Sequence, residues 1–187
     1  MDNKFRNLDF DPRNLPKEYL EAIGMACTCY AQTEDHIQMA IAGLLGVDME
    51  IGWAVTTHMT LPLRESVLKS LTDIKFDDLS DVEEFDRLLA KVSEAANKRN
   101  QIVHHMWCID EDTKEVFQVR AQARARVNVD VMPVSLEAIR ADAGFIYNAG
   151  IELFRFIMTK NLLPTLPSRT RARFDKRKAI KDKRRAK

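Results

Sequence analysis

A chain of 187 residues, 45% of them hydrophobic, is long enough for one domain with a sizeable core. Its six glycines and six prolines favour long helices over a turn-rich β fold. The sequence contains no apolar run of roughly 18 residues and starts with acidic residues, so we expect a cytoplasmic protein with no membrane association.

The net charge of +1 conceals two regions of opposite sign. Residues 167–187 contain 11 basic and 2 acidic side chains, whereas residues 1–166 contain 18 and 26. We therefore expect a helical domain over 1–166 and a flexible basic tail over 167–187. A basic tail favours contact with nucleic acid, or alternatively with an acidic protein surface. The tail residues that we expect to bind nucleic acid are Arg169, Arg171, Arg173, Lys176, Arg177 and Lys178.

Three cysteines, an odd number, argue against a disulfide framework. The four histidines lack the spacing of a zinc site, so we expect no metal ion and no other cofactor.

Apolar residues spaced by three and four predict a long helix from Pro16 to Leu45. Shorter helices are expected from Asp48 to His58 and from Leu61 to Ile74, and a fourth begins near Ser80. The predicted buried residues of the first helix are Leu20, Ile23, Cys27, Tyr30, Glu34, Ile37, Ile41 and Leu44. Those of the fourth are Leu88, Val92, Ala95, Arg99, Ile102 and Met106.

After His105 the pattern alternates, which predicts a β-hairpin with strands over Met106–Asp110 and Val116–Val131. Arg120, Arg124 and Arg126 share one strand face; they either line a path for phosphates or form a solvated face. A last helix follows from Ser135 to Lys160, with Ile139, Ala143, Ile146, Gly150, Leu153 and Ile157 facing inward. The expected fold is mainly α, an up-and-down bundle of about five helices with a β-hairpin insertion before the last helix.

Glu34 and Arg99 each occupy a position that neighbouring turns fill with apolar residues. Because a buried charge needs a partner, we predict that their helices pack together and that the two residues pair. The pair either sets the register of the helices or positions Arg99 for a substrate phosphate. His36, beside Glu34 and Asp35, is predicted to be a solvated partner of these charges.

Asn100 and His104 are four residues apart and lie on one line of the fourth helix. Histidine suits proton transfer near neutral pH, and arginine can stabilise a phosphorane-like transition state. Arg99 lies about 140° from His104 around an ideal helix, so joint action needs the reach of arginine, a distorted helix end or a second subunit. These residue types suit metal-independent cleavage of RNA, in which the 2′-hydroxyl is the nucleophile.

The segment Arg99-Asn100-Gln101-Ile102-Val103-His104, late in a helix of a helical bundle, resembles the motif of HEPN-domain proteins. The resemblance covers roughly residues 16–162. It implies a homodimer whose motif helices face each other, and an endoribonuclease of the toxin or defence type, for which an antitoxin is an expected protein partner. By this resemblance Arg99 and His104 are catalytic and Asn100 supports them. His105 also fits the spacing that the motif permits. Glu34 is expected to be a supporting acid because of its position among the buried residues of the first helix.

Two hypotheses follow from these residues. The first is a dimeric, metal-independent endoribonuclease. The second is a non-catalytic dimeric module that binds RNA or a protein partner, in which Glu34 and Arg99 only set helix register. Exposure of the Arg99 and His104 side chains in a cleft favours the first hypothesis, and burial of His104 in a closed interface favours the second. Trp107, directly after the motif, is expected in the core or at an interface.

Overall fold

The structure is a computed structural model that describes residues 7–124, 126–165 and 182, with only the backbone described at 122–124, 126 and 127. Contacts divide the chain into two compact units, Met1–His36 with Asp78–Phe156, and Ile37–Asp77 with Ile157–Lys187. The predicted basic tail lies outside the described residues apart from Asp182.

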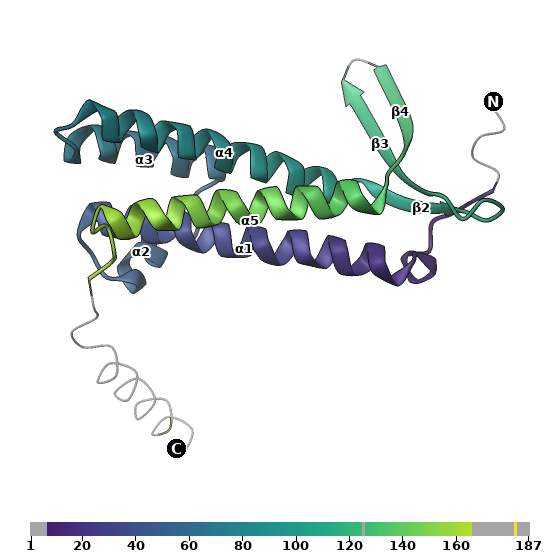
Figure 1. Cartoon of the computed structure of the whole chain (residues 1–187), viewed down its shortest axis with the longest axis horizontal. Helices are drawn as coiled ribbons and strands as arrows, with labels where there is room; N and C mark the ends of the chain where they lie inside the picture. The colour runs from purple at the N-terminus through teal and green to yellow at the C-terminus, as the bar shows by residue number, and fades with distance from the viewer. Residues whose placement is uncertain (1–6, 125, 166–181, 183–187) are drawn as a thin grey trace. The chain divides into compact units, whose positions relative to one another are not determined.

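Five α-helices are described, as the sequence predicts, and a small antiparallel sheet precedes the last of them (Figure 1). Side chains cap three of the helices: Asp48, Asp78 and Ser135 accept hydrogen bonds from the backbone N–H groups of Ile51, Ser80 and Ala138. A short 3-10 helix, η2, spans Pro12–Asn14. The α-helices are α1 (Lys17–Leu45), α2 (Met49–Thr56), α3 (Leu61–Lys75), α4 (Leu79–His104) and α5 (Leu136–Thr159).

The sheet has four strands in the order β1-β2-β3-β4, each antiparallel to its neighbours. The strands are β1 (Leu8–Asp9), β2 (Met106–Asp110), β3 (Val116–Arg124) and β4 (Arg126–Pro133). The expected single strand over Val116–Val131 is therefore wrong, because the chain reverses near residue 125 and β4 returns along β3. The register places Arg120 opposite Asp130 and Arg124 opposite Arg126.

In the unit that contains the sheet, α1, α4 and α5 supply the apolar core. The predicted inward residues of α5 in this unit are confirmed, since all five are buried: Ile139, Ala143, Ile146, Gly150 and Leu153. Gly150 lets α5 approach α1 closely, because a Cβ atom there would lie 2.5 Å from Oγ1 of Thr33. The Thr33 hydroxyl donates to the Cys29 carbonyl at 3.0 Å and also lies 3.4 Å from the Ile146 carbonyl.

The first half of α1 is rotated relative to the sequence prediction. Leu20 was expected inside but is 42% exposed, while the small residues Ala22, Ala26 and Cys29 are buried. Small side chains allow two helices to approach closely, whereas the leucine would hold them apart. The buried face of α1 therefore follows side-chain size rather than hydrophobicity alone.

His36 was predicted to be solvated, and this prediction is wrong. Its ring is buried, stacks on Phe154 of α5 with centroids 4.9 Å apart, and bonds through Nδ1 to the Gly150 carbonyl at 2.9 Å. Because the partner is a carbonyl oxygen, Nδ1 carries the proton and donates it. Burial lowers the pKa of His36, since the charged imidazolium is disfavoured away from water.

The predicted stripe of α4 is confirmed at Leu88, Val92, Ala95 and Ile102, all of which are buried. Met106 was expected to continue it but is 53% exposed, because the helix ends at His104 and Met106 already belongs to β2.

The second unit contains the end of α1, α2, α3 and the end of α5. The predicted inward residues Ile37, Ile41 and Leu44 are buried, as is Ile157. Gly46 ends α1 with a φ of 69°, and the N–H of Val47 bonds back to the Ala42 carbonyl, as is common where a glycine terminates a helix.

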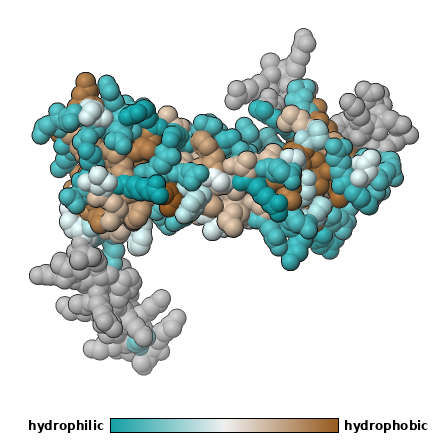
Figure 2. Space-filling model, viewed as in Figure 1, coloured by the Kyte–Doolittle hydropathy of each residue, from teal (hydrophilic) through white to brown (hydrophobic). Residues whose placement is uncertain are grey.

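Hydrophilic side chains cover much of the face seen in Figure 2, with apolar groups between them. Within the described part of the chain, none of the helices combines the length and the apolar character needed to cross a membrane.

Alanine substitutions at Gly150 and Gly144 test the close contact between α5 and α1, with Gly144 as the control. Gly150→Ala should destabilise the fold by about 1–3 kcal/mol, because its methyl group would clash with Thr33 of α1. Gly144→Ala on the same helix meets no atom within 4 Å and should stabilise the fold, by about 0.5–1 kcal/mol, through helix propensity. Urea unfolding of both variants measures the difference. Equal effects of the two substitutions would contradict the close packing of α1 on α5.

Candidate functional site

The stretch Lys98–His105 forms the end of α4, where helix changes directly to strand. His105 has extended backbone angles, φ −88° and ψ 147°, and β2 begins at the next residue. The β-branched and aromatic residues after His105 favour a strand, which explains why the helix stops there.

Two side chains from the sheet bond to the last turn of α4. The indole N–H of Trp107 donates to the Ile102 carbonyl at 2.9 Å, and the Gln118 amide donates to the Gln101 carbonyl at 3.3 Å. The last four carbonyls of a helix have no partner within the helix, so these bonds satisfy groups that would otherwise need water. Trp107 is half-buried and also packs against Leu15, Ile109 and Val116, so it contacts the core, one of the two positions expected for it. The end of α4 is thereby fixed to β2 and β3.

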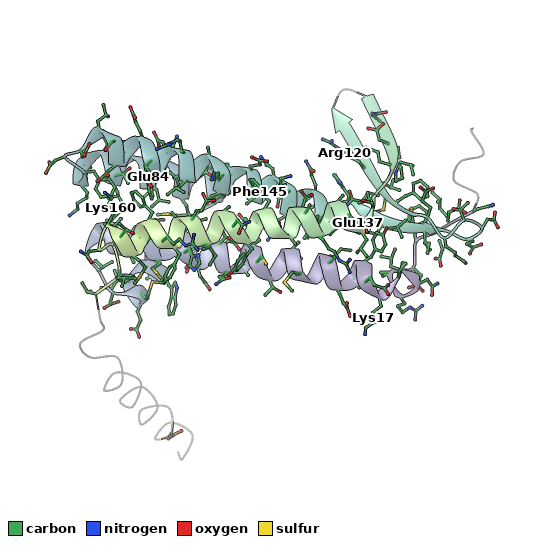
Figure 3. All side chains as sticks on the ribbon, in the orientation of Figure 1. Lys17, Glu84, Arg120, Glu137, Phe145 and Lys160 are labelled. Carbon is green, nitrogen blue, oxygen red and sulfur yellow. The ribbon has the colours of Figure 1, made fainter. Side chains whose placement is uncertain are left out.

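Lys98 binds α4 to α5. Its Nζ lies 2.7 Å from Oδ1 of Asp142 and 5.3 Å from the centre of the Phe145 ring, a residue labelled in Figure 3. The hydrogen bond from Lys98 to the Asp142 carboxylate raises the pKa of Lys98, because it favours the charged ammonium. Both partners are about 30% exposed, with side-chain values of 28% and 31%, so the contact is only partly screened by water.

Arg99, the next residue, faces α1 instead. Its guanidinium lies over the Tyr30 ring, 4.9 Å from the centroid, and donates through Nη1 to Oδ1 of Asn100 at 2.9 Å. That contact confirms the predicted packing of α1 against α4 beside Arg99. Glu34 lies one helical turn after Tyr30 on α1; its ion pair with Arg99 stays a prediction.

Asn100 and His104 are both exposed, on one line of the α4 surface. The described contacts of Arg99 join it to Asn100 and Tyr30, and His104 stands apart at the helix end. Nδ1 of the neighbouring His105 is buried and has no hydrogen-bond partner in the described structure. Within one chain the structure therefore brings Arg99 together with Asn100 and leaves His104 exposed at the end of the helix.

Of the remaining candidate residues, Arg120, Arg124 and Arg126 belong to β3 and β4. Arg120 is half-buried on β3, where Figure 3 labels it. For Arg124 and Arg126 the structure describes the backbone, which pairs them across β3 and β4. The candidate residues of the tail, Arg169 to Lys178, lie outside the described part of the chain. Among the residues that the structure describes, no group of three or more His, Cys, Asp or Glu side chains is arranged to hold a metal ion.

All three cysteines are free thiols, and burial raises the pKa of Cys29 and of Cys108. Cys29 also lines an open apolar groove between α1 and α5. The motif residues are not among those that line this groove, which are Ala22, Met25, Cys29, Arg140, Ala143, Gly144 and Tyr147.

Sequence reasoning missed three of the contacts that define this helix end. Tyr30 was placed in the buried stripe, but its aromatic face as a partner for Arg99 was not considered. Gln118 is buried against α4, with 7% exposure, a contact that the alternating pattern of β3 does not indicate. Nothing in the sequence distinguishes Asp142 from the other acidic residues, and only the fold shows that it forms an ion pair with Lys98.

No family model, curated protein or solved structure matches the chain.

The bond from Trp107 to α4 is directly testable. Trp107→Phe keeps the aromatic ring but removes the N–H donor, so the Ile102 carbonyl loses a partner and the free energy of unfolding should fall by about 1–2 kcal/mol. Trp53→Phe is the matched control, because Trp53 is 48% exposed, and it should change stability by less than about 0.5 kcal/mol. Denaturant unfolding followed by circular dichroism measures both. If Trp53→Phe costs as much as Trp107→Phe, the indole bond does not hold the helix end.

Proposed function

We propose that the chain is a HEPN-like, metal-independent endoribonuclease that acts as a homodimer, of the toxin or defence-related kind. The observation that carries the proposal is the hydrogen bond between Arg99 and Asn100 at the end of α4, with exposed His104 one turn beyond Asn100. The resemblance of this segment to the HEPN motif supplies the roles of the three residues.

In the proposed reaction His104 accepts the proton of an RNA 2′-hydroxyl as its oxygen forms a bond to the neighbouring phosphorus. Arg99 binds the phosphate and stabilises the negative charge that grows on its oxygens. The bond from phosphorus to the 5′-oxygen then breaks, and that oxygen takes up a proton. The products are a 2′,3′-cyclic phosphate end and a 5′-hydroxyl end, and no step uses a metal ion.

A second copy of the chain has a specific place in this mechanism. In one chain Arg99 lies over Tyr30 while His104 is exposed, about 140° away around an ideal helix. Two α4 helices facing each other would supply Arg99 from one chain and His104 from the other to a single phosphate. Arg120, Arg124, Arg126 and the basic residues of the tail would bind the RNA backbone outside the cleavage point.

The contact between Arg99 and Tyr30 also favours a second function. A guanidinium held over an aromatic ring contributes to the packing of α1 on α4 whether or not RNA is cleaved. The alternative is therefore a non-catalytic dimeric module that binds RNA, an antitoxin or another protein partner. In that case Arg99 is a structural residue and His104 a solvated one.

An RNA cleavage assay in EDTA separates the two functions. The wild type should cleave a single-stranded RNA and leave cyclic phosphate ends, and His104→Ala should lower the rate by about 10²-fold or more. Arg99→Ala should also abolish most cleavage. His105→Ala shows which of the two neighbouring histidines transfers the proton.

His58→Ala is the matched control, because His58 is an exposed histidine outside α4 and its loss should leave the rate unchanged. Circular dichroism of each variant verifies that it is folded. Undiminished cleavage in folded His104→Ala and His105→Ala variants, or no cleavage by the wild type, would rule out the enzyme and leave the binding module.

A further inference from the structure

The free side of β4 is a surface that the proposed function does not use. In the part of the chain that the structure describes, β4 pairs only with β3, so its other edge presents unpaired backbone N–H and C=O groups. Figure 1 shows the outer halves of β3 and β4 projecting away from α4 and α5. An open edge of this length is a template for another strand, and proteins usually block it.

One face of this hairpin is apolar and changes from buried to exposed toward its tip. Val119 is buried with 3% exposure, but Ala121 is exposed and Val129, which is paired with it, is 44% exposed. Val131, two residues further along β4, continues the same apolar face. An exposed valine-rich face beside an open edge favours a partner strand that extends both.

The sequence of β4 is complementary to itself when two copies run antiparallel. With Asn128 on a two-fold axis, Asn128 faces Asn128 of the second copy, position 127 faces position 129, and position 126 faces position 130. This register sets the basic Arg126 opposite the acidic Asp130 twice, and it keeps the valines of both strands on one face.

Other two-fold registers lack this match. An axis through Asp130 would set two carboxylates opposite each other, which is destabilising. An axis through Val129 would pair Arg126 with Met132 and Asp130 with Asn128, so neither charge would meet an opposite charge of the second copy. Asp130 is a charge that would ordinarily protect the edge, but in the register centred on Asn128 a second copy of this strand supplies it with an opposite charge.

We propose that β4 is a homotypic interaction surface, at which two copies of the chain join their sheets antiparallel with Asn128 on the two-fold axis. The joined sheet has eight strands, and the Arg126–Asp130 pairs select the register. This surface is separate from α4, and the proposal does not depend on ribonuclease activity.

Cysteine crosslinking of the full-length chain reads this register directly. Opposed residues of antiparallel strands have Cα atoms about 4.5–5.5 Å apart, within the range of a disulfide. Asn128→Cys should therefore give a crosslinked dimer under mild oxidation. Met132→Cys is the matched control: it is as exposed as Val129, at 43%, but would lie roughly 26 Å along the strand from its copy.

Charge reversal then tests the pairing. In the Asn128→Cys background, Arg126→Asp and Asp130→Arg should each lower the crosslinked fraction, by about tenfold at limiting protein concentration, because each sets like charges opposite twice. An equimolar mixture of the two variants restores both opposite-charge pairs. The mixture should therefore crosslink as a heterodimer at the level of the parent, which a size tag on one variant makes visible.

The proposal is overturned if Asn128→Cys crosslinks no more than Met132→Cys, or if the charge-reversed variants crosslink as well alone as when mixed. Failure of these experiments leaves the RNA cleavage assay unaffected, and failure of that assay leaves the β4 surface unaffected.

Discussion

Two neighbouring cations near the end of α4 hold the helix against two different helices. Lys98 contacts Asp142 and Phe145 of α5, and Arg99 contacts Tyr30 of α1. Residues one apart on a helix point about 100° apart, so this arrangement requires α4 to lie against both neighbours at once. Each cation sits against an aromatic ring, which stabilises a partly buried charge without a fully buried ion pair.

The sheet fixes the same helix end from the other side. Trp107 and Gln118 bond to the carbonyls of the last turn, so α4 is held at 98 and 99 by helices and at 101 and 102 by strands. The polar side chains of Asn100, Gln101 and His104 remain exposed beside these contacts. A helix end held in place on several sides, with exposed polar groups, suits a catalytic or binding site. Its side chains are already ordered by folding, so that binding a ligand loses less conformational entropy.

The parts of the fold that sequence predicted well have aliphatic residues at unambiguous spacing, as in α5, where the buried face follows Ile139 to Leu153. Prediction failed where small residues form the buried face, as in the first half of α1, since alanine and cysteine give a weak periodic signal. It failed at His36 because two neighbouring acids suggest solvent, while its true contacts, Gly150 and Phe154, are more than 110 residues away. The reversal near residue 125 lacks glycine, proline and asparagine, so β3 and β4 looked like one strand. For the candidate site, the sequence predicted the α4 segment and the packing of α4 against α1, but the aromatic partner of Arg99 follows only from the fold.

A double-mutant cycle on Tyr30 and Arg99 tests whether the ring of Tyr30 sets the position of Arg99 at the end of α4. Tyr30→Leu, Arg99→Met and the double variant are compared by urea unfolding. If the ring holds the guanidinium, the two residues should show a coupling free energy of about 0.5–2 kcal/mol. Additive effects of the two substitutions would contradict it, because Arg99 would then be held at the end of α4 by something other than Tyr30.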